Sequence, residues 1–369
     1  MTIVDVDPER TYPAVGVLNR GRGLLHRDPL PGSATAYKTL NRVGPGMLVY
    51  SRLKAFEGAI TVTPDDLQES FASQEFPTFD FAPGASPDFF RILATTQIMW
   101  DALQGVSKGM GGRRERVKPA DFLGIVMEIP SLPIQERIVR IVDAVDDLII
   151  ALDAEVDAIA RVRAGMVGTA ADVQHLSIGS LGTVSQGRGL PKRYQGKRTG
   201  EISWYKIADM TGPGNEFGYT LADTRLSTSD VTDIGGVVVG AGAVTFPRVG
   251  AAVLTEKKRI LDVPGALDEN HLVIAPGESV NPEYLLAVME NFTLASLVRP
   301  GAVPSLNMSL IRSTKVPWSW TENESLGDAL GALRAEARAL ATEAACLRKA
   351  RAGLLAALLS RTVQIEPAG

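Results

Sequence analysis

The sequence contains a single cysteine, Cys346, among its 369 residues. One cysteine excludes an internal disulfide framework and a cysteine-rich zinc site, and it favours a reducing compartment such as the cytoplasm. Histidine is also scarce, because only His26, His175 and His271 are present. Their scattered positions give no metal-ligand spacing, so the sequence does not indicate a metal centre or a histidine-dependent catalytic mechanism.

Long apolar runs are absent. No segment approaches the roughly 20 apolar residues that a membrane-spanning helix needs. Residues 1–10 are acidic and lack the charged-then-apolar pattern of a secretory leader. The sequence therefore predicts a cytoplasmic protein without membrane contact.

An excess of positive charge is lacking as well. Lysine and arginine number 38 against 42 aspartates and glutamates, which gives a formal net charge of −4 at pH 7. This balance argues against binding nucleic acid by bulk electrostatics, so DNA binding would have to use local groups of basic side chains. Nucleotide-binding motifs are missing too, because no P-loop lysine or dinucleotide fingerprint follows the glycine-rich segments.

The composition is that of a folded soluble chain, with 45% hydrophobic and 22% charged residues, and the length suits two modules. Two segments show the alternating steps of three and four that are typical of coiled coils. The first seam consists of Ile138, Ile141, Val145, Leu148, Leu152, Val156 and Ile159. The second, interrupted only by Arg351, consists of Leu326, Leu330, Leu333, Ala337, Leu340, Ala344, Leu347, Leu354 and Leu358. We expect these helices to pair antiparallel.

The two helices belong to a repeat. Arg163-Ala164-Gly165-Met166 matches Arg351-Ala352-Gly353-Leu354 about 188 residues later. Before each helix, short apolar runs bounded by glycine and proline indicate strands. The predicted strands are 47–53, 202–207, 236–239, 243–246 and 271–274, and the predicted shorter helices are 88–103 and 282–298. This order predicts a mixed α/β module at 1–130, a long helix at 131–172, a second module at 173–317 and a second long helix at 318–362.

Three stretches resemble the specificity subunits of type I restriction-modification systems. Residues 129–139, Ile-Pro-Ser-Leu-Pro-Ile-Gln-Glu-Arg-Ile-Val, are similar to the proline-rich helix start of that family. Residues 202–210 and 240–250 resemble the opening strand and the glycine-led strand of a target-recognition domain. In the first half, Tyr50 and Arg52 parallel Phe246 and Arg248.

The sequence departs from the family pattern in two places. Residues 175–203 have no counterpart before Tyr12, which suggests an abbreviated first domain. The second long helix lacks the glutamine-glutamate start, because Trp318-Ser319-Trp320-Thr321-Glu322 stands there.

The resemblance implies a non-catalytic DNA-recognition subunit with two mixed α+β target-recognition domains and an antiparallel coiled coil of two long helices. Each domain would read one half of a bipartite site in double-stranded DNA. The helices, at about 45 Å for roughly 30 residues, would set the spacing and dock two modification (methyltransferase) subunits. A restriction/translocase subunit would complete the assembly. The chain itself would bind no cofactor, and S-adenosylmethionine would belong to the methyltransferase partner.

The candidate DNA contacts are basic or aromatic residues in glycine-rich loops and in the strands that carry the resemblance, since arginine and lysine contact guanine and phosphates. In the first half they are Arg20, Arg22, Arg27, Tyr50, Arg52, Lys54, Lys108, Arg113 and Arg114. In the second half they are Arg188, Lys192, Arg193, Lys197, Arg198, Tyr205, Lys206 and Arg248. The candidate spacer and partner-binding residues are Gln135, Glu136, Ile138, Ile141, Val145, Leu148, Leu330, Leu333, Leu340 and Leu347.

Other readings remain open at the level of sequence. The chain could serve another DNA modification or defence system, or be an inactive copy that binds DNA without a partner. A coiled-coil scaffold with β-rich binding modules would explain the helices and the acidity equally well. A hydrolase would need paired carboxylates in a cleft, and the pairs Asp65-Asp66 and Asp268-Glu269 lie where turns are expected.

Overall fold

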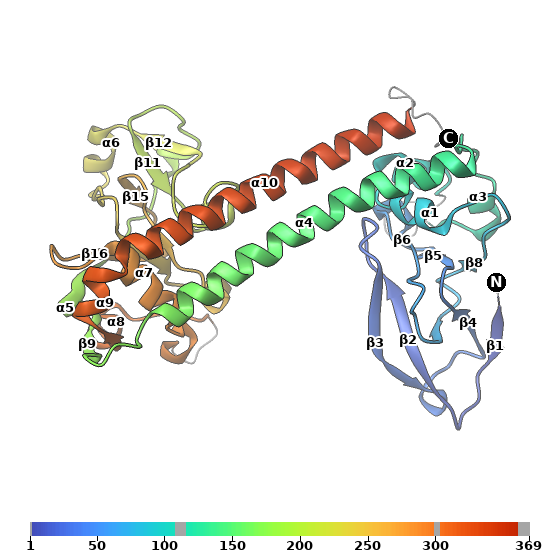
Figure 1. Ribbon diagram of the computed structural model, residues 1–369, viewed down its shortest axis with the longest axis horizontal. Helices are drawn as coiled ribbons and strands as arrows, with labels where there is room; N and C mark the ends of the chain where they lie inside the picture. The colour runs from blue at the N-terminus through green and yellow to red at the C-terminus, as the bar shows by residue number, and fades with distance from the viewer. Residues whose placement is uncertain (1, 108–115, 299–302, 361–369) are drawn as a thin grey trace. The chain divides into compact units, whose positions relative to one another are not determined.

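The computed structural model describes residues 2–107, 116–298 and 303–360 (Figure 1). The chain divides into two compact units, a first unit of residues 1–148 and 347–369 and a second unit of residues 149–346. Helix α4 (Leu132–Met166) and helix α10 (Gly327–Leu359) each belong partly to the first unit and partly to the second. The mixed α/β class, with two β-rich domains and two long helices in contact, is confirmed.

The first unit contains a five-stranded sheet in the order β1-β4-β7-β2-β3 and a three-stranded sheet in the order β6-β5-β8. All neighbouring strands are antiparallel except β2 and β7. The strands are β1 (Ile3–Asp5), β2 (Thr11–Val17), β3 (Leu24–Pro31), β4 (Thr39–Val43), β5 (Leu48–Tyr50), β6 (Ile60–Val62), β7 (Ser70–Ala72) and β8 (Thr78–Phe79). The helices are α1 (Pro87–Leu93), α2 (Gln97–Gly105), α3 (Pro119–Leu123) and the 3-10 turns η1 (Gly32–Ala34) and η2 (Ala55–Glu57).

The predicted single helix at 88–103 is wrong, because α1 and α2 are separate helices. The hydroxyl groups of Thr95 and Thr96 donate back to the carbonyls of Ile92 and Leu93, which ends α1. Thr96 then accepts the backbone N–H of Met99 and so forms the N-cap of α2.

The second unit contains sheets in the orders β10-β16-β13-β14, β12-β11-β15 and β17-β9. Its strands are β9 (Gln174–Ser177), β10 (Gly182–Gln186), β11 (Ile202–Tyr205), β12 (Thr224–Leu226), β13 (Val244–Pro247), β14 (Arg259–Ile260), β15 (Gly265–Leu267), β16 (His271–Pro276) and β17 (Lys315–Trp318). Its shorter helices are α5 (Ile178–Leu181), α6 (Thr228–Asp233), α7 (Pro282–Asn291), α8 (Met308–Ser313) and α9 (Trp320–Ser325). The 3-10 turns are η3 (Lys192–Tyr194), η4 (Ile207–Thr211), η5 (Ala251–Thr255) and η6 (Leu294–Leu297).

The predicted strand at 236–239 is wrong. Only Val239 pairs, in an isolated bridge with Gly265, while Val237 is exposed. Gly235, at φ 62°, turns the chain in a conformation that interrupts a strand.

The two units share a strand pattern. The parallel pair β2 and β7 of the first unit matches the parallel pair β11 and β15 of the second. Strand β5 lies between β6 and β8, as β13 lies between β14 and β16. The second unit adds β10 beside β16, and β10 comes from the segment 175–203 that has no sequence counterpart in the first half.

The helices α4 and α10 pack against each other within each unit. In the first unit Ile138 and Val142 of α4 share a core with Leu355 and Leu358 of α10. In the second unit the Arg163 guanidinium donates to the carbonyl of Leu330. The start of each helix thus meets the end of the other, which is antiparallel pairing.

The buried seam of α4 differs in part from the predicted one. Val142 and Ile149 are buried, whereas Ile141 is half-buried and Leu148 is 46% exposed. The seam therefore begins with a step of four residues, because the buried residue after Ile138 is Val142 and not Ile141. In α10 the interrupting Arg351 forms an ion pair with Asp146 of α4.

A buried amide joins the start of α4 to the start of α1. The Gln135 side chain accepts the backbone N–H of Ser86 (2.8 Å) and donates to the carbonyls of Gly84 (3.2 Å) and Pro130 (2.8 Å). Ser86 is the N-cap of α1. Gln135 is 1% exposed, so its amide hydrogen-bonds only to these internal backbone groups.

The second unit has the same arrangement at Asn323. Its side chain accepts the backbone N–H of Asn281 (2.8 Å), the N-cap of α7, and donates to the carbonyl of Ser279 (2.9 Å). Asn323 follows Gln135 at the same spacing of about 188 residues that relates the two halves of the sequence. We call these two arrangements the amide clamps.

The second long helix is divided into α9 and α10 at Leu326. A Cβ atom at Gly327 would lie 1.9 Å from the Asn281 side chain, so only glycine fits there. Just before the break, the buried Glu322 carboxylate accepts the N–H groups of Gly168 (2.7 Å) and Thr169 (2.8 Å) and the Tyr284 hydroxyl (2.7 Å). Burial alone would raise the pKa of Glu322, but these hydrogen bonds outweigh burial and lower it.

Candidate nucleic-acid interface

Three loops of the second unit meet at the turn Asp268–His271, which we call the β15–β16 turn. They follow the ends of β10, β11 and β13 and carry the predicted contacts Arg188, Lys206 and Arg248, respectively. The loops converge because β10 and β13 both pair with β16, and β11 pairs with β15. The sheet pairing thus gathers basic residues that are distant in sequence.

The first of these loops approaches the turn very closely. The backbone N–H of Arg188 donates to the carbonyl of Leu267 at 3.0 Å. A Cβ atom at Gly187 would lie 2.0 Å from the carbonyl oxygen of Asp268, so glycine is required there. The Nε of the exposed Arg188 donates to the carbonyl of Gly235 (3.1 Å), which leaves its two terminal nitrogens without a partner in the described residues.

The third loop is tied to the turn by Arg248. Its backbone N–H donates to the carbonyl of Asn270 (2.7 Å), and its Nε donates to the carbonyl of Glu269 (2.9 Å). Its own carbonyl accepts the N–H of Leu306 at 2.9 Å. The guanidinium is therefore oriented at the turn while remaining half-buried.

A buried chain of hydrogen-bonded side chains supports the turn on its core side. His271 Nδ1 donates to the Asp268 carboxylate (2.7 Å), and His271 Nε2 lies 2.8 Å from the Tyr219 hydroxyl. Asp268 also accepts the N–H groups of Ile207 (3.2 Å) and Asn270 (3.0 Å). Burial alone would raise the pKa of Asp268, but the bond from His271 and the backbone bonds lower it.

The predicted cluster at 192–198 lies mostly on the surface, with Lys192, Arg193 and Arg198 exposed. Arg193 stacks over the Tyr194 ring at 4.8 Å. Lys197 is committed to an ion pair with Asp230. The hydrogen bond from Lys197, together with those from Ser227, lowers the pKa of Asp230 to about 2.

In the first unit, two loops that are distant in sequence bring basic residues together. The loop with Arg20 and Arg22 is joined to the loop after β5 by backbone bonds from Arg20 to Glu57 (3.1 Å) and from Gly21 to Gly58 (2.8 Å). Arg20, Arg22 and Lys54 are exposed on these loops. Arg27 is exposed on β3, and its guanidinium lies over Gly16.

The backbone N–H and carbonyl of Arg52 in the first unit form the same pair of hydrogen bonds as those of Arg248. Its N–H donates to the carbonyl of Glu75 (2.8 Å), and its carbonyl accepts the N–H of Val117 (3.0 Å). Glu75 lies in the turn Ser73–Phe76, which links β7 to β8 as the β15–β16 turn links its own strands. We call Ser73–Phe76 the β7–β8 turn. The predicted parallel between Arg52 and Arg248 thus has a structural counterpart.

Two candidate DNA contacts do not lie on the surface. Tyr50 and Tyr205 are both fully buried, because Tyr50 stacks on Phe122 (4.8 Å) and Tyr205 stacks on Tyr219 (4.4 Å). These tyrosines support the loops that follow them and present no atom to DNA. The candidates Lys108, Arg113 and Arg114 lie outside the described residues.

The candidate spacer and partner-binding residues fall into three groups. Gln135, Ile138 and Leu330 are buried, so their contacts are internal. Glu136 and Leu148 are exposed, as are Ile150 and Val162 on the same helix. The half-buried positions are Ile141, Val145, Leu333, Leu340 and Leu347.

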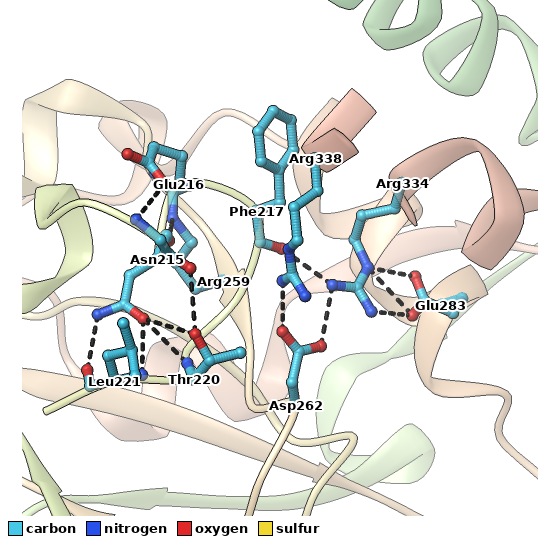
Figure 2. Close-up of polar contacts among 11 residues, drawn as sticks. Asn215, Glu216, Phe217, Thr220, Leu221, Arg259, Asp262, Glu283, Arg334 and Arg338 are labelled. Carbon is cyan, nitrogen blue, oxygen red and sulfur yellow. Dashed lines mark hydrogen bonds and ion pairs between the residues drawn. The ribbon is translucent and has the colours of Figure 1, made fainter. Parts of the chain in front are cut away.

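An ion-pair network anchors the α/β module of the second unit to α10 (Figure 2). Arg334 binds Glu283 of α7 through Nε (3.0 Å) and Asp262 through a terminal nitrogen (2.9 Å), and it donates to the carbonyl of Phe217 (3.2 Å). Arg338 forms a second ion pair with Asp262. Burial alone would lower the pKa of Arg334, but the two carboxylates raise it.

Sequence reasoning missed this network and the Asp268–His271–Tyr219 chain. Neither has a local motif, because their members are brought together by strand pairing and helix packing. Asn323 could have been found, because it stands at the repeat spacing from Gln135.

Within residues 2–107, 116–298 and 303–360, no group of three histidine, cysteine or acidic side chains is placed to hold a metal ion. No helix in this part of the chain is long and apolar enough to span a bilayer.

Two mixed α/β modules, each with basic loops at strand ends and each packed on part of an antiparallel helix pair, define a class of proteins with two modules and two paired long helices. No known family profile matches the sequence, and no curated protein is similar to it in sequence. The structure is similar to the S subunit of the type I restriction-modification system from M. genitalium, with a TM-score of 0.52, 12% identity, and coverage of 99% of this chain and 94% of that chain. The chain therefore has the fold of a type I restriction-modification specificity subunit.

Two further solved structures are similar at lower scores. A chain from a type I R-M system, described for its complex assembly and conformational transition, has a TM-score of 0.49, 13% identity, and 97% coverage of both chains. The HsdS subunit from Thermoanaerobacter tengcongensis has a TM-score of 0.39 and 13% identity, with coverage of 95% of this chain and 91% of that chain.

Proposed function

We propose that this chain is the DNA sequence-specificity subunit of a type I restriction-modification system. The observation that carries the proposal is the fold, which extends over both recognition modules and both long helices. Each module would read one half of a bipartite site in double-stranded DNA. The two long helices would set the spacing of the half-sites and dock two modification subunits, and a restriction/translocase subunit would join them.

The exposed basic residues of each module support DNA as the ligand. In the second unit, Arg188 in the loop after β10 and Lys192 and Arg193 in η3 are exposed, and the half-buried Arg248 lies in the loop after β13. In the first unit, Arg20, Arg22 and Lys54 are exposed on loops at strand ends. Such groups neutralise phosphates locally, which a chain with a net charge of −4 needs if it binds DNA.

The chain itself would catalyse no step. The sequence Asn281-Pro282-Glu283-Tyr284 lacks the second proline of the amino-methyltransferase tetrapeptide, and Asn281 serves as the N-cap of α7. Methyl transfer, and the S-adenosylmethionine that it consumes, would therefore belong to the modification subunits.

The test is co-purification with any methyltransferase that is encoded beside this gene, followed by mapping of methylated adenines in DNA exposed to the complex. We expect a split, asymmetric motif. Replacing Arg188, Lys192 and Arg193 with alanine should weaken or alter one half-site only, while Arg161→Ala, an exposed arginine on α4, should change neither. Absence of both complex and methylation would contradict the proposal.

A scaffold without DNA binding is the second candidate, and salt dependence separates the two. Binding through phosphate contacts releases counterions, so affinity for a DNA duplex should fall steeply between 50 and 200 mM salt. A scaffold would show no such binding at either concentration.

A further inference from the structure

We infer that base choice in the two half-sites is made by the β15–β16 turn and the β7–β8 turn, through Glu269 in the second unit and Gln74 in the first. The inference rests on the proposed function and names the elements that would carry its specificity.

Glu269 is exposed at the position where the three basic loops of the second unit meet. Its backbone carbonyl accepts the Arg248 Nε, and a Cβ atom on Gly189, next to Arg188, would lie 3.6 Å from its carboxylate. Yet its carboxylate forms no ion pair within the described residues. A carboxylate among phosphate-binding arginines repels DNA unless it accepts a hydrogen bond from a base, and the amino group of cytosine is the donor that glutamate accepts from.

The turn is built rigidly enough to place such a side chain. Asp268 and His271, the first and last residues of the turn, bind each other, and His271 contacts Tyr219 below. Arg248 and the Gly187 loop fix the turn from two further sides. Only the side chains of Glu269 and, in part, Asn270 are left toward solvent.

The first unit repeats this construction with different chemistry. The β7–β8 turn is held by Asn41, which is 1% exposed and donates to the carbonyls of Ser73 (3.4 Å) and Phe76 (3.0 Å). Gln74, the second residue of this turn, is exposed and corresponds to Glu269. Its Nε2 donates to the Thr39 hydroxyl (2.6 Å), which positions the amide and leaves one N–H and the carbonyl oxygen for a base. A glutamine amide pairs with adenine rather than cytosine, so the two turns would prefer different bases.

The experiment uses the full chain in complex with its methyltransferase, on a plasmid library with randomised sites. Glu269→Ala should relax the base preference at one position of one half-site, by about 5- to 150-fold in discrimination. Gln74→Ala should relax one position in the other half-site. Glu324→Gln removes an exposed negative charge on α9 and should leave both preferences unchanged.

The outcomes separate the inference from the proposed function. Failure of the unchanged protein to direct methylation would overturn the proposed function and with it this inference. Methylation at an unchanged motif by both alanine variants, with thermal stability retained, would overturn the inference alone. Relaxation in the same half-site by both variants would also overturn it, because the turns lie in different units.

Discussion

At the residue scale, the second unit depends on polar groups that are buried as a connected set. Asp268 is 7% exposed and His271 is fully buried, and each satisfies the other. Removal of one member leaves the remaining members without partners in an apolar surrounding, which costs more than the bond itself contributes. The Asp268–His271–Tyr219 chain is therefore a structural support, and its loss should lower stability as well as the proposed DNA recognition.

The lowered pKa of Asp268 predicts acid sensitivity of the second unit. Because the folded-state pKa lies below the unfolded value, the carboxylate contributes stability above the unfolded pKa of about 4, and this contribution is lost as pH falls through the folded pKa. Asp268→Asn should flatten the fall in unfolding free energy below about pH 4. His271→Ala should cost about 1 to 3 kcal/mol at pH 7.

Chemical denaturation between pH 3 and 7 measures both effects. Glu324→Gln, at an exposed position of the same unit, is the control and should leave the pH profile as it is. An Asp268→Asn profile parallel to that of the unchanged protein would show that this carboxylate is not the linked group.

At the element scale, the amide clamps fix how each long helix leaves its module. Each clamp side chain accepts the backbone N–H of an N-cap residue, Ser86 of α1 or Asn281 of α7. Because the two clamps belong to different units, they can be broken one at a time. Breaking one clamp should then change the stability of its own unit only.

Gln135→Leu and Asn323→Leu should each destabilise one unit by about 1 to 3 kcal/mol, because a buried N–H loses its acceptor. Hydrogen exchange measures the effect locally. Gln135→Leu should speed exchange at Ser86 and Asn323→Leu at Asn281, while Glu136→Ala, exposed beside the first clamp, should speed neither. Faster exchange at both amides in either variant would argue against independent clamps.

The elements that the sequence predicted best are those with a long period. Seven apolar positions over about six turns indicate α4. Only the choice between Ile141 and Val142, or between Leu148 and Ile149, lies beyond the pattern, because both members of each pair are apolar. The internal contacts of Gln135 could not be predicted, because two of its partners are backbone groups about 50 residues away that carry no sequence signature. The DNA contacts and the domain limits stay predictions.

At the scale of the whole molecule, the proposed spacer role makes helix length a variable. A heptad adds about 10.5 Å to a helix, which corresponds to roughly three base pairs along DNA. Inserting one heptad into both α4 and α10 keeps the antiparallel seam in phase. The inserted pair should therefore lengthen the gap of the bipartite motif without changing either half.

Methylation mapping of the doubly inserted variant tests this prediction. A heptad in α4 alone is the matched control, because it lengthens one helix of the pair and should abolish methylation or destabilise the protein. An unchanged gap in the double insertion would remove the spacer role from the proposed function while leaving the reader role intact.

The core of the first unit combines segments that the ribosome synthesises at different times. Ile138 and Val142 pack against Leu355 and Leu358, which lie more than half the chain later. Ribosomes add about 5 to 20 residues per second, so roughly 10 to 40 s pass between synthesis of the start of α4 and of the end of α10. During that interval the early half exposes an apolar strip on α4, and chaperones that hold nascent chains should find it there.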